Sequence, residues 1–154
     1  MNELDKISIE PVNSERKRFI ALLLEGDEQE DMIDRYLERG DMYVMKREGE
    51  TVCVCVVTDE GGGVLEIKNI ATAAHCRGKG YGRAMINFLL ERYRGSFSVM
   101  RVGTGDSPLT VPFYEKCGFK RDFVVKNFFT DNYDHPIIEG GVQLKDMVYF
   151  TRDF

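Results

Sequence analysis

The chain is poor in cysteine and histidine, with 4 and 2 of them among 154 residues, and it has no tryptophan. The four cysteines lack the spacing of a disulfide framework, and Cys53 and Cys55 stand two apart on an expected strand, so we predict reduced core thiols. His75 and Cys76 are adjacent, but no spacing typical of a zinc site surrounds them. We therefore expect neither disulfides nor a bound metal.

Long apolar runs are also missing, and none approaches the roughly 18 residues of a membrane span. The first six residues have neither the basic start nor the apolar segment of a secretory signal, so we expect a cytoplasmic protein with no membrane partner. A net charge of −5 disfavours nucleic acid, which proteins bind by neutralising phosphates with Lys and Arg. The acidic balance gives a weak hint of a cationic partner.

The apolar content is sufficient for one core: 43% of the residues are hydrophobic, and 10 Phe and 7 Tyr are among them. A chain of this length makes one ordinary domain, whereas a division would leave two marginal cores. We predict a single domain over residues 1–154.

Hydrophobic spacing predicts the order of the secondary-structure elements. Strands are expected at 7–12, 42–46, 51–58, 64–71, 97–102, 119–129 and 143–151, and helices before Gly26 and at 28–39, 80–93 and 111–117. Hairpins fill the first half and crossovers the second, which is typical of an α/β protein with a sheet of mixed direction. Residues 130–141 are expected to form a loop.

Three local features refine these expectations. Asn13 or Ser14 could cap the first helix, and residues 47–50 read as a hairpin turn. In the strand at 64–71, Leu65 and Ile67 share one face but Ile70 lies on the other, which predicts a β-bulge near Lys68-Asn69.

The segment Arg77-Gly78-Lys79-Gly80-Tyr81-Gly82-Arg83 joins an expected strand to an expected helix. Its three glycines leave backbone N–H groups open at a helix N-terminus, where the helix dipole favours an anion, and its three cations add charge. A dinucleotide fingerprint would need glycine at Arg83, and a P-loop would need Ser or Thr at Gly80. An anion site and a merely flexible glycine-rich turn both remain open.

This segment resembles the pyrophosphate loop of GCN5-related N-acetyltransferases (GNAT). A second element, Phe113-Tyr114-Glu115-Lys116-Cys117-Gly118-Phe119, is similar to the family's aromatic-Tyr-x-x-x-Gly-Phe pattern. The resemblance covers nearly the whole chain. It implies a mixed, mostly antiparallel sheet with a splayed central strand pair and about four helices. It also implies transfer of acetyl from acetyl-CoA to a primary amine of a small molecule or protein by direct attack in a ternary complex, and a possible homodimer.

The resemblance assigns roles to individual residues. Glu66 would be the general base, although it could instead be a strand carboxylate paired with Lys68 or Arg101. Tyr114 would be the general acid, or else a core tyrosine. Coenzyme A would contact the strand end, the loop and the segment before the last helix, where Ser107 replaces the Asn often found in the family. The expected contacts are Ile70, Ala71, Thr72, Arg77, Gly78, Lys79, Gly80, Tyr81, Gly82, Arg83 and Ser107.

Two functions from different classes stay open at this point. One is the acetyltransferase, whose acceptor could be a polyamine, an aminoglycoside-like molecule, an amino acid or a protein amine. The other is a non-catalytic acyl-CoA-binding regulatory module that has kept the loop and lost the base. A covalent acetyl-cysteine at Cys117 is disfavoured, because the local sequence offers it no histidine partner.

Overall fold

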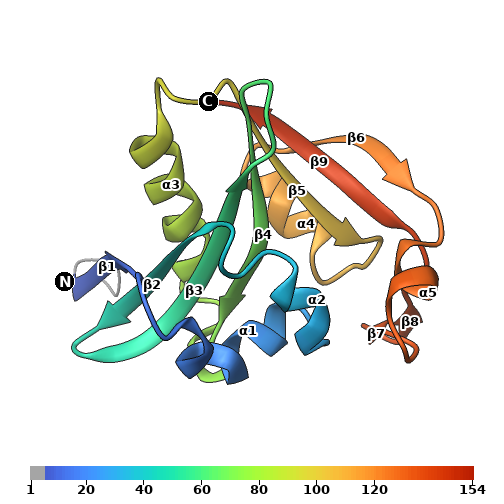
Figure 1. Ribbon diagram of the computed structural model, residues 1–154, viewed down its shortest axis with the longest axis horizontal. Coiled ribbons are helices and arrows are strands. Elements are labelled where there is room, and N and C mark those ends of the chain that lie inside the picture. The colour runs from blue at the N-terminus through green and yellow to red at the C-terminus, as the bar shows by residue number, and fades with distance from the viewer. Residues whose placement is uncertain (1–5) are drawn as a thin grey trace. The chain divides into compact units, whose positions relative to one another are not determined.

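The computed structural model describes residues 6–154, which divide into two compact units. The N-terminal unit holds the described residues up to Asp59 together with 67–94, and the C-terminal unit holds 60–66 and 95–154. The strand β4 (Val64–Thr72) begins in the C-terminal unit and continues in the N-terminal one from Ile67. Figure 1 labels the elements of both.

The N-terminal unit contains a run of antiparallel strands. Strand β1 (Ile7–Pro11) pairs with β2 (Asp41–Arg47), and β2 pairs with β3 (Glu50–Asp59). Glu48 and Gly49 turn the chain between β2 and β3 with φ values of 52° and 83°, which confirms the predicted hairpin. Every residue from Val52 to Val57 is buried, as expected for a central strand.

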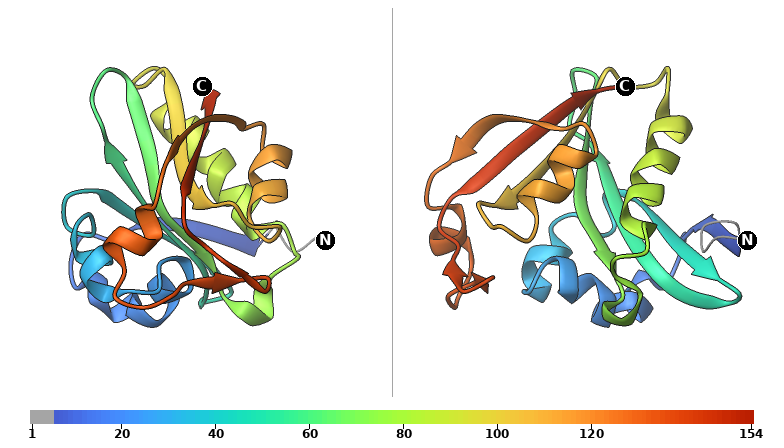
Figure 2. Two further views of the ribbon diagram at one scale, coloured as in Figure 1. Left: turned by 90° about the vertical axis from the view of Figure 1, so that its right-hand side faces the viewer. Right: turned by 180° about the vertical axis from the view of Figure 1, so that it is seen from behind.

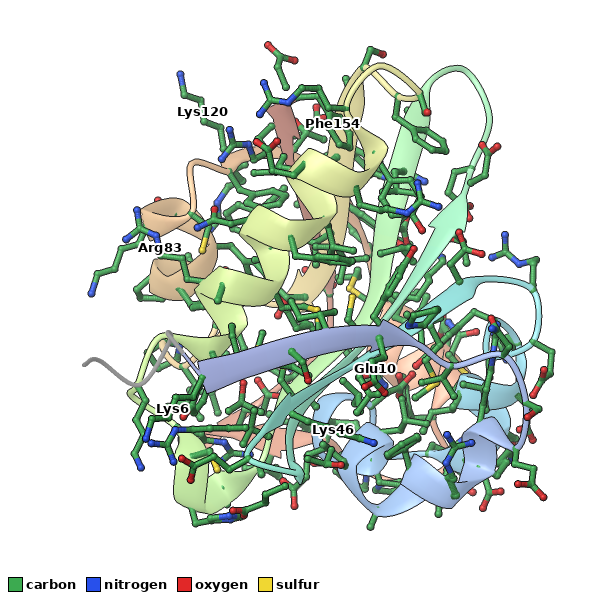
Figure 3. The ribbon with its side chains drawn as sticks, turned by 90° about the vertical axis from the view of Figure 1, so that its left-hand side faces the viewer. Lys6, Glu10, Lys46, Arg83, Lys120 and Phe154 are labelled. Atoms are coloured by element: carbon green, nitrogen blue, oxygen red, sulfur yellow. The ribbon has the colours of Figure 1, made fainter. Side chains whose placement is uncertain are left out.

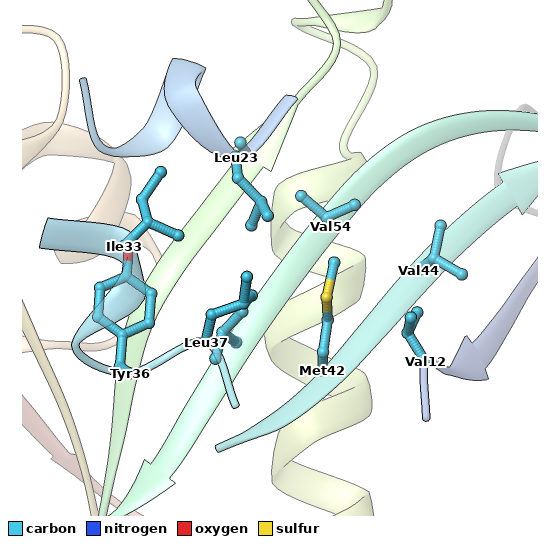
Figure 4. Close-up of a cluster of buried hydrophobic side chains, with 10 residues drawn as sticks. Val12, Leu23, Ile33, Tyr36, Leu37, Met42, Val44 and Val54 are labelled. Atoms are coloured by element: carbon cyan, nitrogen blue, oxygen red, sulfur yellow. The ribbon is translucent and has the colours of Figure 1, made fainter. Parts of the chain in front are cut away.

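Helices cover both faces of these strands (Figure 1). On one face, η2 (Arg16–Phe19), α1 (Ile20–Gly26) and α2 (Glu30–Asp34) enclose an apolar cluster with β2 and β3, shown in Figure 4. On the other face lies α3 (Tyr81–Tyr93), where the Phe88 ring packs edge-on against Tyr43 with 5.0 Å between centroids. Alternate β2 residues therefore serve two cores: Met42 and Val44 belong to the first, and Tyr43 to the second.

The first helix lacks the side-chain cap that the sequence suggested. Neither Asn13 nor Ser14 caps the first helix; Glu15 precedes η2 with φ 51° and makes no side-chain cap. The Arg16 guanidinium instead donates to the carbonyls of Val12, Leu37 and Gly40. Residues 35–39 form turns and α2 ends at Asp34, short of the predicted helix 28–39.

The C-terminal unit is built on a second antiparallel ribbon. Strand β9 (Met147–Asp153) pairs with β5 (Val99–Gly105) on one side and with β6 (Lys120–Val125) on the other, as Figure 2 shows. Helix α4 (Val111–Lys116) starts late because Pro112 fits only its first turn, as predicted.

The end of this unit departs from the sequence expectations. Strand β6 stops at Val125 rather than 129, because Asn127 turns the chain at φ 59° and its N–H donates to Asp146. A helix, α5 (Phe128–Asn132), follows, and the expected loop contains the hairpin partner β7 (Ile138–Glu139) of β8 (Val142–Gln143). Strand β9 then begins at Met147 rather than 143. Phe129, Ile137 and Leu144 form a small core that holds this segment together.

The strands form a seven-stranded sheet in the order β1-β2-β3-β4-β5-β9-β6, mixed and mostly antiparallel, which confirms the predicted fold class. The splaying of a central strand pair stays a prediction. No helix within residues 6–154 has the length and apolar character to cross a membrane. All four cysteines are buried and none forms a disulfide, as predicted. Burial raises the pKa of the Cys53 thiol to about 12.

Candidate functional site

The glycine-rich loop lies in the N-terminal unit, between η3 (Ala74–Cys76) and α3. All residues from Arg77 to Gly80 are exposed. Gly78 and Gly80 have φ values of 79° and 87°, a conformation that other residues rarely adopt, and nothing stands within 4 Å of where a Gly78 Cβ would be. The first turn of α3 leaves N–H groups without intrahelical partners, so this open backbone is suited to an anion.

The side chains of the loop differ in what they can offer such an anion. Arg77 lies 3.2 Å from the Glu25 carboxylate and also donates to the Thr72 carbonyl. Arg83 is exposed on α3 and points away from the strands (Figure 3). The Tyr81 side chain is 2% exposed and belongs to the core, so only its backbone N–H can face a ligand.

The end of β4 provides the strand segment expected to meet the pantetheine arm. Ile70 and Thr72 are half-buried, and Ala71 is buried. The Ala73 N–H donates to the Val52 carbonyl, which fixes the chain leaving β4 against β3. Backbone contacts of coenzyme A with Ile70, Ala71 and Thr72 stay a prediction.

Asn69 gives another cause for the break in the apolar pattern of β4. From Ile67 onward burial alternates, with Ile67, Asn69 and Ala71 buried and Lys68, Ile70 and Thr72 half-buried, so Asn69 fills one inward position. A polar residue at an inward position accounts for the apparent slip as well as a bulge does, and the bulge near Lys68-Asn69 stays a prediction.

Asn69 also belongs to a polar network that the sequence did not reveal. Its Nδ2 donates to the Leu23 carbonyl at 2.9 Å and to the Tyr36 hydroxyl at 3.1 Å, and Tyr36 donates to Asp27 at 2.9 Å. Burial and the nearby Asp27 charge raise the pKa of Tyr36 well above its usual value. A Cβ on Gly26 would lie 2.3 Å from Asn69 Oδ1, so Gly26 leaves the room that Asn69 needs. The signal for this network in the sequence was a polar residue at a strand position where the alternation predicts a buried side chain.

Glu66 lies in the C-terminal unit, where it is 3% exposed rather than facing solvent. The Arg101 Nε donates to its Oε1 at 2.7 Å, which realises one of the two pairings anticipated from the sequence. Arg101 also lies over the rings of Tyr149 and Phe123, at 5.5 and 5.9 Å from their centroids. Burial and the Glu66 charge raise the pKa of Tyr149. Glu66 is thus a buried carboxylate bonded to Arg101, and the rings of Tyr149 and Phe123 hold the Arg101 guanidinium in position.

Tyr114 lies on α4, also in the C-terminal unit, and is 7% exposed. Its ring contacts Phe113, Phe119 and Phe150, with centroid distances of 5.1, 5.8 and 6.4 Å. The ring is therefore part of an aromatic core. This packing holds the phenol in place whether or not its hydroxyl takes part in catalysis.

Two further predicted residues have structural partners near α4. Ser107 is 2% exposed; its Oγ accepts the Leu109 N–H at 3.1 Å, and its carbonyl accepts the N–H groups of Thr110 and Val111. It shapes the turn into the helix, and a contact with coenzyme A stays a prediction. Cys117 is buried and its carbonyl accepts the Arg152 guanidinium, which favours a packed helix residue over a covalent nucleophile.

Comparisons with known proteins agree with the two motifs. Residues 38–121 match the sequence model of the Acetyltransferase (GNAT) domain. The Bacillus subtilis (strain 168) protein described as uncharacterized N-acetyltransferase YvbK is 32% identical over 152 residues, which cover 97% of this chain and 98% of that protein.

Two solved structures have nearly the same fold. One is a GNAT family acetyltransferase from Elizabethkingia anophelis with acetyl-CoA bound, at a TM-score of 0.92 and 32% identity over 97% of this chain and 99% of the other. The second is an IAA acetyltransferase from Bacillus cereus ATCC 14579, at a TM-score of 0.88 and 33% identity over 96% and 99% of the two chains.

Proposed function

The chain belongs to the GNAT family of acetyltransferases, and we propose that it moves the acetyl group of acetyl-CoA directly to a primary amine. The observation that carries this proposal is the open backbone of the loop before α3, with Gly78 and Gly80 in the left-handed region. The acetyl-CoA bound to the Elizabethkingia anophelis protein, 32% identical to this chain, supports it.

Coenzyme A would be held mainly by backbone groups. Its pyrophosphate accepts hydrogen bonds from the N–H groups at the start of α3, where Lys79 and Arg83 add positive charge. Its pantetheine arm pairs with the backbone of Ile70, Ala71 and Thr72 in the manner of an added strand. Such an arrangement fixes the thioester without a dedicated side chain.

The reaction requires proton transfers at two places, the acceptor nitrogen and the leaving thiolate. An alkylammonium has a pKa near that of Lys, about 10.4, so a base must remove a proton before the nitrogen can attack. We assign this role to Glu66. The attack gives a tetrahedral oxyanion, which the N–H near Ile70 stabilises. The acylated nitrogen loses its second proton to solvent, the C–S bond breaks, and Tyr114 donates its proton to the thiolate of coenzyme A and regains one from solvent.

The acceptor is proposed only as a class: a primary amine of a small molecule or of a protein. The net charge of −5 suits a cationic acceptor, because an acidic protein attracts an ammonium group before binding. The relative named an IAA acetyltransferase adds one specific compound to test.

The experiment that tests the function is thiol release from acetyl-CoA. The purified protein is incubated with acetyl-CoA and a panel of polyamines, aminoglycosides, amino acids, peptides with free amines, and IAA. We expect release above the acceptor-free rate with one group of these compounds and formation of its N-acetyl product. A non-catalytic module would bind acetyl-CoA in calorimetry and give no acceptor-dependent release with any of them.

A further inference from the structure

Three side chains able to bind a metal meet in the N-terminal unit, next to the loop but outside it. Glu50 is the first residue of β3, and His75 and Cys76 end η3. One ligand atom of each lies within 4.8 Å of the other two, and no second cluster of this kind occurs in residues 6–154. We propose that Glu50, His75 and Cys76 bind a divalent transition-metal ion, with zinc the best match. The sequence gave no zinc spacing because Glu50 stands 25 residues away from His75.

The backbone under these three residues is already fixed. The Cys76 N–H donates to the Ala73 carbonyl at 2.8 Å, and the Ala73 N–H donates to the Val52 carbonyl of β3 at 2.9 Å. Glu50 itself stands opposite Arg47 in the β2–β3 ladder. The ligands from η3 and from β3 are therefore held at a set spacing, so binding an ion needs only side-chain adjustment.

The ligand types select the ion. A thiolate, an imidazole and a carboxylate suit zinc, whereas magnesium and calcium prefer oxygen ligands alone. Zinc bonds of about 2.0–2.3 Å at tetrahedral angles put neighbouring ligand atoms roughly 3.3–3.7 Å apart. The His75 Nε2–Glu50 Oε1 distance of 2.5 Å would widen by about 1 Å to reach this spacing. The thiolate and the carboxylate balance the charge of the ion, and a water molecule completes four ligands.

A metal ion can reach these three side chains from solvent, and its binding breaks only one weak contact. The side chains of His75 and Glu50 are 68% and 61% exposed, while Cys76 is 5% exposed beneath them, so an ion can enter from solvent and reach the thiol. An exposed side-chain contact such as His75–Glu50 contributes little to stability, so replacing it with metal bonds loses little. Since Arg77 follows Cys76 directly, a bound ion would link the start of β3 to the first residue of the loop.

Cobalt(II) titration followed by absorption tests the proposal directly. Cobalt replaces zinc in such sites, and a thiolate ligand adds a charge-transfer band that an oxygen–nitrogen site lacks. We expect this band together with the visible bands of a four-coordinate ion, at one cobalt per chain, and their loss when zinc is added. Zinc should also raise the melting temperature, since it binds the folded state.

Variants assign the ligands. Cys76→Ser should abolish the charge-transfer band. Glu50→Gln and His75→Gln, at exposed positions that folding tolerates, should each weaken cobalt binding at least roughly 100-fold, because even the outer partners of metal ligands are worth about 10- to 100-fold. His135→Gln is the matched control: His135 forms the same kind of exposed pair with Asp134, at 2.6 Å, without a cysteine. It should leave the titration unchanged.

Three results would overturn the proposal. They are the absence of cobalt binding to the wild type, binding without a thiolate band, and equal affinity in the wild type, Glu50→Gln and His75→Gln. None of these depends on the acetyltransfer reaction, so the metal site and the proposed function stand or fall separately.

Discussion

Two regions of the molecule would act through different groups. The exposed loop before α3 offers its backbone to a ligand, whereas Glu66 and Tyr114 would act through buried side chains. In the loop, glycines present backbone groups, and the surroundings of Gly78 are empty. Glu66 and Tyr114 are 3% and 7% exposed, and ionic or aromatic neighbours fix their side chains. Changes in the loop should therefore alter binding with little loss of stability. Changes at the buried residues act on both properties, so each needs a paired measurement.

The largest effect is expected for Tyr114→Phe. This change removes the proposed proton donor and keeps the ring among Phe113, Phe119 and Phe150. Turnover should fall by roughly 10²–10⁴, the range for one general acid, while acetyl-CoA affinity stays within about 3-fold. Turnover, calorimetric affinity and melting temperature are measured on one preparation.

Phe119→Leu separates packing from chemistry at the same place. Phe119 is 2% exposed and contacts the Tyr114 ring, so the change loosens the cluster without removing a hydroxyl. It should lower the stability by about 1 kcal/mol or more and preserve most of the turnover. If Tyr114→Phe behaves in this way too, with stability lost and turnover kept, Tyr114 is a core residue and another donor protonates the thiolate.

The next largest effect is expected for Glu66→Gln. At neutral pH the acceptor is an ammonium ion, so without a base the rate should fall about 100-fold, at the lower end of the range for general-base catalysis. As the pH approaches the acceptor pKa of about 10, the free amine accumulates and the variant should regain most of the wild-type rate. The pH–rate profiles of both proteins provide the measurement.

A variant of Arg101 helps to distinguish a catalytic Glu66 from a structural one. A purely structural Glu66, paired with Arg101 at 2.7 Å, predicts that Glu66→Gln loses melting temperature and shows a pH–rate profile parallel to the wild type. Arg101→Gln would then lower the melting temperature too, because each change removes one charge of the partly buried Glu66–Arg101 pair, while Arg101 also lies 3.9 Å from Glu60. A parallel profile would remove Glu66 from the mechanism.

The sequence predicted local structure correctly where a residue type has a single structural role. Glycines ahead of a helical apolar pattern predicted that the segment 77–83 leads into α3, and Pro112 predicted the late start of α4. It failed where distant residues decide the structure. The Arg16 guanidinium donates to the carbonyls of Leu37 and Gly40, more than 20 residues away, and no local pattern encodes such a contact.

The candidate site shows the same limit. The position of Glu66 on a strand could be predicted, but its burial beside Arg101, 35 residues further on, depends on strand pairing. The burial of Asn69 could not be predicted either, because a polar residue at an inward position breaks the apolar alternation in the same way as the predicted bulge. Its partners, Leu23 on α1 and Tyr36 in the turns after α2, are brought to β4 only by the folded chain.

Gly78→Asp tests the loop alone. The new side chain needs no space from a neighbour, but it brings a negative charge to the place proposed for the pyrophosphate. Losing one hydrogen bond to a charged group costs about 1.5–3 kcal/mol, so acetyl-CoA affinity should fall roughly 10- to 150-fold. The control is Gly95→Asp at the other end of α3, where φ is 86° and the space is equally open. Both variants carry the same backbone strain, so equal affinity in the two would place the cofactor elsewhere.

The smallest effect concerns Glu25, which lies 3.2 Å from Arg77 across an exposed ion pair. Glu25→Gln removes a negative charge close to the proposed anion site and leaves Arg77 in place. Acetyl-CoA affinity should therefore rise by about 2- to 5-fold, the scale of an exposed charge interaction. The gain should shrink as salt increases, because the screening length falls from about 10 Å at 0.1 M to 3 Å at 1 M. Glu91→Gln is the matched control, since Glu91 forms a similar exposed pair with Arg94 near the C-terminal end of α3. If both variants bind acetyl-CoA like the wild type at low salt, the Arg77 charge does not contribute to the site, and the backbone of the loop with Lys79 and Arg83 accounts for binding there.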